Sequence, residues 1–171
     1  MVDLERFTIR LSRNADTIAS LVQGVAQAQA RWKPDSQAWS ILEVINHLYD
    51  EEREDFRQRL DLILHQPDRP WPPNDPEGWV IERQYNQRDL KISLENFLKE
   101  RERSLAWLND LATPNWENSH KHPSAGTITA NDMLAAWAAH DLLHLRQLVE
   151  LHWAYHAQGA RPIALNYAGI W

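Results

Sequence analysis

Apolar side chains recur three or four positions apart over four long stretches of the chain, the spacing that places them on one face of an α-helix. The stretches run from about residue 3 to 31, 40 to 64, 86 to 111 and 129 to 158. Polar and charged residues fill the positions between the apolar ones. The pattern therefore predicts four long amphipathic helices.

Two of the predicted helices begin with a capping signal. Ser40 stands three residues before Glu43, an arrangement in which the hydroxyl and the carboxylate each accept a hydrogen bond from a backbone amide of the first turn. Thr129 and Asp132 repeat this arrangement with an aspartate. These pairs fix the starts of the second and fourth helices.

The connections between the helices differ in character. Five prolines in residues 66–78 exclude a helix there, because proline lacks the amide donor, and they predict a long loop. A second, polar connection contains His120 and His122 and precedes the last helix. Gly159, with a proline soon after it, ends that helix and leaves an irregular tail over residues 159–171.

Four amphipathic helices bury their apolar faces most simply against one another. We therefore expect an all-α protein, a four-helix bundle with long connections between helices two and three and between helices three and four. A length of 171 residues fits one domain. We predict that domain over residues 1–171, with its core at about residues 3–158.

Charge and composition narrow the range of functions. Lys and Arg number 18 against 24 Asp and Glu, and a net charge of −6 argues against a nucleic-acid partner. Cysteine is absent, so a transition-metal site would have to use imidazole and carboxylate ligands. The first residues lack the apolar run of a signal peptide, and no stretch reaches membrane-span length, so we expect a cytoplasmic protein with no membrane partner.

A pair of histidines on the fourth helix is the first candidate for chemistry. His140 and His144 are four residues apart, so both imidazoles share one helix face. The pair alone is a weak signal, because a long helix with several histidines produces it by chance. However, residues 133–145 are apolar nearly all round, and an imidazole that is buried there needs a partner.

The second helix supplies a candidate partner. His47 lies among Val44, Ile45 and Leu48, on or near the face that turns to the core. Three neutral imidazoles around a divalent ion leave coordination positions open for water or substrate, as in catalytic sites. The alternative is that these histidines are hydrogen-bonded core residues.

Two separated motifs give the chain a resemblance to a known family. Residues 39–48 read WSILEVINHL, while residues 122–129 read HPSAGTIT and are followed by AHDLLHLRQL at residues 139–148. In this order the motifs resemble those of the DinB-like, or YfiT-like, proteins, a family that includes thiol-dependent transferases. The resemblance covers nearly the whole chain.

The resemblance implies both a fold and a site. Members of that family are four-helix bundles in which one histidine of the second helix and a His-x-x-x-His pair of the last helix hold a divalent metal. Carried over by position, the ligands are His47, His140 and His144. The resemblance also implies that the two helices face each other at the same height.

The ligand set restricts the metal and the reaction without fixing either. Imidazole suits zinc, nickel, iron or copper; we expect zinc or nickel, with iron or manganese as alternatives. Such an ion activates bound water, polarises a carbonyl group or binds a thiolate. We therefore expect a metal-dependent hydrolase or thiol transferase that acts on a small molecule, with a low-molecular-weight thiol as a candidate partner.

Glu51 is the candidate catalytic residue beside the metal. It lies one turn after His47 on the same face, where it would serve as a fourth ligand, as an acceptor behind a ligand or as a general base. The competing interpretation is that the charge run at residues 50–55 forms a solvated helix face.

For three other residues near His140 and His144, the sequence allows two interpretations each. Trp137 would wall the metal pocket or belong to the core, and Trp39 would close the pocket mouth or pack on the bundle. Asp141 would orient an imidazole or face water. The remaining histidines of the last connection and helix are expected at the surface; they are His120, His122, His152 and His156.

The sequence is also compatible with two non-catalytic functions. One is a metal-stabilised module that binds a small apolar ligand among the tryptophans. The other is a dimerisation module whose histidines are buried and hydrogen-bonded without a metal. The resemblance also implies a homodimer, because relatives often pair through helix faces.

Overall fold

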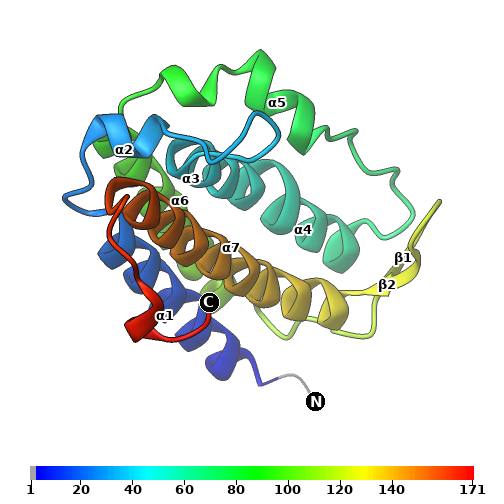
Figure 1. The fold of residues 1–171 in the computed structure, drawn as a ribbon. Helices are drawn as coiled ribbons and strands as arrows, with labels where there is room; N and C mark the ends of the chain where they lie inside the picture. Colours follow the sequence, from blue (N-terminus) through cyan, green and yellow to red (C-terminus); the bar gives the residue numbers. More distant parts are fainter. Residues whose placement is uncertain (1–2) are drawn as a thin grey trace.

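The computed structural model describes residues 3–171; Met1 and Val2, which belong to the predicted domain and to the N-terminal stretch, lie outside it. Four long helical segments form the bundle (Figure 1). One of them is continuous through three elements, α3, η1 and α4. The segments are α1 (Leu4–Val22), α3 (Ile41–Asp50) with η1 (Glu51–Phe56) and α4 (Arg57–His65), α6 (Leu90–Asp110) and α7 (Ala130–Gly159).

The apolar faces of these helices meet as the sequence pattern predicts. Helix α1 packs against α6 and α7, while α3 packs against α6 and α7 from the other side. The fully buried side chains include Leu11, Ile18, Ile45, Phe97 and Leu148. Over residues 3–171, no helix combines the length and the apolar character that crossing a membrane requires.

The first predicted helix ends earlier than expected. The prediction of one helix over residues 3–31 is wrong, because the chain turns after Val22 and a short α2 (Gln27–Arg31) follows. Gly24 has a φ of +82°, a left-handed conformation that glycine adopts without steric cost and that ends a helix. The apolar spacing continues across this turn, so periodicity alone could not reveal it.

The second predicted helix is confirmed in extent but contains a π-helical segment, η1. A π turn bonds each amide to the carbonyl five residues earlier and inserts an extra residue into the helix. Glu51 and Glu52 are adjacent in sequence, and both are buried, at 3% and 1% exposure. The solvated face predicted for residues 50–55 is therefore wrong; Asp50 and Asp55 are buried as well.

Both long connections contain structure that the sequence pattern did not predict. The proline-rich loop ends at Asp75, which caps α5 (Pro76–Glu82); Pro76 occupies a first-turn position where a missing amide donor has no cost. A 3₁₀ turn, η2 (Tyr85–Gln87), follows. The connection before α7 forms an antiparallel hairpin of β1 (Ser119–His122) and β2 (Gly126–Thr129).

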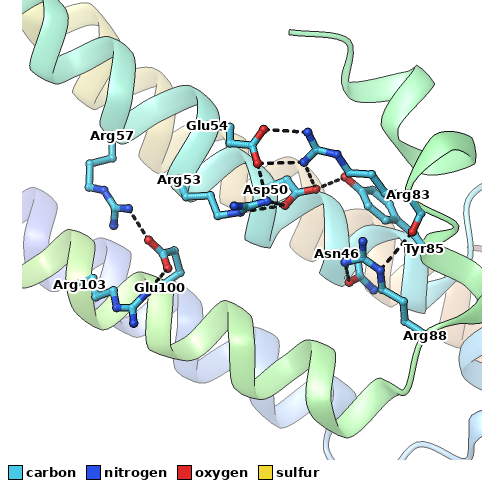
Figure 2. A network of polar contacts seen from close by, with 10 residues as sticks. All are labelled: Asn46, Asp50, Arg53, Glu54, Arg57, Arg83, Tyr85, Arg88, Glu100 and Arg103. Carbon is cyan, nitrogen blue, oxygen red and sulfur yellow. Dashed lines mark hydrogen bonds and ion pairs between the residues drawn. The ribbon is translucent and has the colours of Figure 1, made fainter.

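The segment with α5 and η2 is fastened to the second helix by ion pairs. Figure 2 shows Arg83 reaching across to both Asp50 and Glu54. The guanidinium lies 2.6 Å from Asp50 and 2.8 Å from Glu54, and the Tyr85 hydroxyl also donates to Asp50. Side chains of the charge run thus hold the first long connection in place.

The C-terminal residues follow the predicted irregular course. A single 3₁₀ turn, η3 (Asn166–Ala168), interrupts them. The last residue, Trp171, stacks on Trp153 of α7 with ring centroids 4.8 Å apart. The tail thereby returns to the outer face of the last helix (Figure 1).

Candidate metal centre

Three imidazoles from two packed helices meet inside the bundle. Nε2 of His140 lies 3.3 Å from Nε2 of His47 and 3.1 Å from Nε2 of His144. All three ligand atoms lie within 4.8 Å of one another. The ring of His47 is buried, and the two rings on α7 are partly buried. The structure therefore brings together the three histidines that the sequence singled out.

The local sequence accounts for this placement. The capping box of Ser40 and Glu43 is formed as predicted and starts α3 at Ile41, six residues before His47. The box of Thr129 and Asp132 starts α7 in the same way. From these starts, the apolar faces of α3 and α7 turn inward, and the helices pack against each other.

The spacing of the nitrogens suits a shared cation better than mutual hydrogen bonding. A neutral imidazole nitrogen carries either a proton or a lone pair. One shared proton can therefore link only two of the three rings, and the nitrogen of the third ring would face another nitrogen without a hydrogen bond between them. Two nitrogens bound to one tetrahedral ion at roughly 2.0–2.1 Å lie about 3.3 Å apart. The two separations from His140, 3.3 and 3.1 Å, match that value, and all three ligand atoms lie within 4.8 Å of one another, so the donor set fits a divalent ion.

The surroundings keep the three imidazoles neutral. Burial lowers the pKa of His47 to about 2, and neighbouring His144 and His140 disfavour a charge further. Burial also lowers the pKa of His140 to about 3, with His144 and Arg101 adding repulsion. The pKa of His144 is lowered by burial too, against the opposing effects of Gln147 and Asp141. Neutral rings present the lone pairs that metal binding requires.

The tautomer of His144 is set by a neighbour one turn along α7. Its Nδ1 lies 2.8 Å from the Oε1 of Gln147. Because an amide oxygen only accepts, Nδ1 carries the proton and Nε2 keeps its lone pair. Gln147 was not singled out from the sequence; its position three residues after a candidate ligand is the signal that could have identified it.

Glu51 lies behind His47, on the side of Nδ1. Its Oε1 is 3.8 Å from that nitrogen, too far for a hydrogen bond, and neither atom has a hydrogen-bond partner among the described residues. Burial, reinforced by the Asp55 carboxylate, raises the pKa of Glu51 to about 9. Asp55 itself pairs with Arg59 at 2.6 Å. A buried carboxyl group is thus available to the ring nitrogen that faces away from the cluster.

The two tryptophans lie differently relative to the histidines. The Trp39 ring is 4.9 Å from that of His47 and is stacked parallel to that of His144 at 6.4 Å. Trp39 also lines a surface cleft of about 680 Å³. Trp137 is only 1% exposed and stacks on Phe56, which in turn lies 5.0 Å from the His140 ring. Trp39 therefore borders the cluster, while Trp137 is a core residue.

Asp141 follows His140 but faces a different partner. It is 1% exposed and binds the guanidinium of Arg101 through both oxygens, each at 2.8 Å. Arg101 also donates to Glu52 at 2.6 Å. Neither Arg101 nor Glu52 was recognised as a site residue, because the charge patterns of α6 and of residues 50–55 are typical of surface helices.

The four remaining candidate histidines do not join the cluster. His120 donates from Nδ1 to the carbonyl of Pro67, and His122 accepts the backbone amide of Ala125. His152 lies against α1, with its Nε2 2.8 Å from a carbonyl of that helix. His156 is exposed. The expectation of surface positions is therefore met for His156, whereas His120, His122 and His152 are partly buried.

The facing helices of the bundle turn three histidine nitrogens toward one point. The protein is therefore a helical bundle with a candidate divalent-metal centre. The chain belongs to the DinB superfamily, whose family model matches residues 10–148. The resemblance drawn from residues 39–48 and 139–148 is thereby confirmed.

Two similar proteins are described by their names as metal-dependent hydrolases. A proposed metal-dependent hydrolase of Oceanobacillus iheyensis is 30% identical over 117 residues, which cover 68% of this chain and 66% of that protein. The solved structure of YfiT from Bacillus subtilis, described as a probable metal-dependent hydrolase with an unusual four-helix bundle topology, superposes with a TM-score of 0.77. It is 19% identical, and the match covers 88% of this chain and 87% of that one. The predicted four-helix bundle is confirmed.

Proposed function

We propose that His47, His140 and His144 bind one divalent cation and that the protein is a metal-dependent enzyme acting on a small molecule. The observation that carries this proposal is the convergence of three neutral Nε2 atoms, with two separations of 3.3 and 3.1 Å. The names of the similar proteins favour hydrolysis as the reaction. We expect zinc or nickel, with iron or manganese as alternatives.

When bound by three imidazoles, such an ion would act as a Lewis acid, with coordination positions left open for water or substrate. The chain's own residues then orient the ligands. Gln147 accepts a hydrogen bond from the Nδ1–H of His144, and Glu51 lies where it would accept one from the Nδ1–H of His47. The carboxyl oxygen lies 3.8 Å from the ring nitrogen that faces away from the cluster, which supports the acceptor role for Glu51 over the ligand role.

Aromatic rings border the site on two sides. Phe56 covers the His140 ring, and Trp39 covers His47 and His144 while also lining the 680 Å³ cleft. We propose that a small substrate approaches past Trp39 from this cleft. None of the three histidines lines this cleft, so Trp39 is the side chain that connects it to the cluster.

Metal analysis of matched variants tests the binding proposal. Purified wild-type protein, loaded with excess zinc or nickel and then desalted, is expected to retain one equivalent, whereas His144→Ala loses it. His156→Ala is the control, because His156 is an exposed histidine of the same helix. Equal metal content in wild-type and His144→Ala would contradict the proposal.

Activity screening of the metal-loaded protein tests the reaction. We expect hydrolysis of simple ester or amide substrates that His47→Ala abolishes. Transfer of a low-molecular-weight thiol to an electrophile would instead identify a thiol transferase, the alternative that a thiolate-binding ion permits. Metal retention without either activity would favour a non-catalytic, metal-stabilised binding module. The homodimer and the cytoplasmic location stay predictions of the sequence.

A further inference from the structure

A buried ion network joins the two helices that carry the three histidines. Arg101, on α6, is 2% exposed and lies between Glu52 of η1 and Asp141 of α7. Glu52 comes five residues after His47, and Asp141 follows His140 directly. The network therefore links both sides of the candidate metal centre through a third helix that contributes no histidine to it.

All five guanidinium hydrogens of Arg101 have acceptors. Nε and Nη2 donate to Oε1 of Glu52 at 2.9 and 2.6 Å. Nη1 and Nη2 donate to the two oxygens of Asp141, and Nη1 also donates to the carbonyl of Leu11 at 2.7 Å. Because the guanidinium is planar and its N–H directions are fixed, its acceptors can shift little relative to it without losing hydrogen bonds. The relative positions of η1 and α7 are thus held by directional bonds.

Two further donors tighten the same network. Trp137 donates from Nε1 to Glu52 at 2.7 Å, and Asn14 donates from Nδ2 to Asp141 at 3.1 Å. Glu52 and Asp141 are therefore each bound by a second side chain in addition to Arg101.

A contribution to folding stability alone does not explain this buried ion network. Desolvation of buried ions often costs as much as their attraction returns, and well-packed apolar side chains do as well or better. Apolar contacts such as that of Phe56 with Trp137 would hold the helices together without fixing their register. Metal ligands, in contrast, must be placed to within about 0.2 Å.

We infer that Arg101 is a positioning residue for the metal centre: by binding Glu52 and Asp141, it fixes the helix that carries His47 relative to the helix that carries His140 and His144. This inference rests on the proposed metal site. The π turn contributes, because its extra residue allows neighbouring Glu51 and Glu52 both to point inward, one toward His47 and the other toward Arg101.

The test compares Arg101→Met with Arg57→Met. Arg57 also crosses to α6, where it binds Glu100 and Ser104, neither of which lies on a helix that carries one of the three histidines; Figure 2 shows its ion pair with Glu100. Zinc dissociation constants from chelator competition and the visible absorption bands of bound Co²⁺ are measured at a temperature where circular dichroism shows folded protein. We expect Arg101→Met to weaken zinc binding at least tenfold and to change the cobalt bands, and Arg57→Met to alter neither.

Two variants keep the inference testable if Arg101→Met does not fold. The neutral triple variant Glu52→Gln/Arg101→Met/Asp141→Asn removes all three charges, so it leaves none unpaired in the core; it is expected to fold with the same weakened binding. Arg101→Lys, which keeps the charge but loses the fork, should recover only part of the affinity. Wild-type affinity and cobalt bands in Arg101→Met or in the triple variant would overturn the positioning role. Wild-type protein that binds neither zinc nor cobalt would overturn the metal site and this inference together.

Discussion

Oε1 of Gln147 accepts a hydrogen bond from Nδ1 of His144 at 2.8 Å, one helical turn along α7. Because both residues lie on the same helix, the bond depends on local geometry and needs no other element. It leaves Nε2 of His144 as a lone-pair donor toward His140. A residue that never touches the proposed ion thus sets the ligand character of one that does.

Gln147→Leu is expected to weaken zinc binding by about 10-fold or more, because the His144 ring loses the acceptor that fixes its tautomer and orientation. Gln147→Glu, which keeps an acceptor, should bind zinc at least as tightly as wild type. Competition with a chromophoric chelator measures both constants. Unchanged affinity in Gln147→Leu would show that the bond has no part in metal binding.

Cation binding is expected to stabilise the fold, because the ligands converge only in the folded chain. At a free zinc concentration 100 times the Kd, the gain is about 2.7 kcal/mol. Thermal unfolding followed with zinc and with excess chelator measures this gain. His144→Ala should unfold at the same temperature in both conditions, while the control His156→Ala should respond to zinc as wild type does.

Glu51→Gln is expected to change the pH dependence of stability in the metal-free protein. Burial raises the pKa of Glu51 to about 9 in the folded chain from its ordinary value of 4.5, so the unfolded chain releases this proton first. Its stabilising contribution is complete below pH 4.5 and is lost as the pH rises to about 9. The stability of Glu51→Gln relative to wild type should therefore increase over this window.

Denaturant unfolding of both proteins at pH 5, 7 and 9, in the presence of chelator, measures the difference. Glu51→Gln keeps the shape of the protonated side chain, so the two proteins should differ little near the acidic end. A difference that stayed constant across the range would show that the carboxyl group of Glu51 is ionised in the folded chain.

Thr129→Ala is expected to destabilise the protein by about 1 kcal/mol, because the hydroxyl accepts the amide of Asp132 at 3.0 Å and caps α7. The unfolding temperature should fall by roughly 2–4 °C for a chain of this size. Zinc affinity should not change, since His140 lies three turns further along the helix. Thr127→Ala in the exposed part of the hairpin is the matched control.

The sequence by itself determined the bundle and its candidate ligands. Apolar spacing near 3.6 residues, together with the caps at Ser40 and Thr129, placed the long helices, because these signals are local. The four-residue interval between His140 and His144 fixed their common face for the same reason. His47 joined them through its apolar neighbours and through the family resemblance.

Local signals were insufficient where an element depends on the rest of the chain. The hairpin at residues 119–129 and short helix α5 were missed, since each is short and lies in polar or proline-rich sequence. The break at Gly24 was missed because the apolar spacing continues across it. The buried charges of residues 50–55 were missed for a different reason. A run of Asp and Glu reads as a solvated helix face unless its cationic partners are known.

Those partners come from sequence positions far away, and only the tertiary structure decided them. Arg101 is 49 residues from Glu52 and 40 from Asp141, and Arg83 is 33 from Asp50. Whether a charged side chain faces water or an opposite charge depends on which helices pack together, a property that no local pattern contains. Local patterns in the sequence therefore identify the helices and their histidines, whereas the pairing of the charges that hold the helices in register is determined only by how the helices pack.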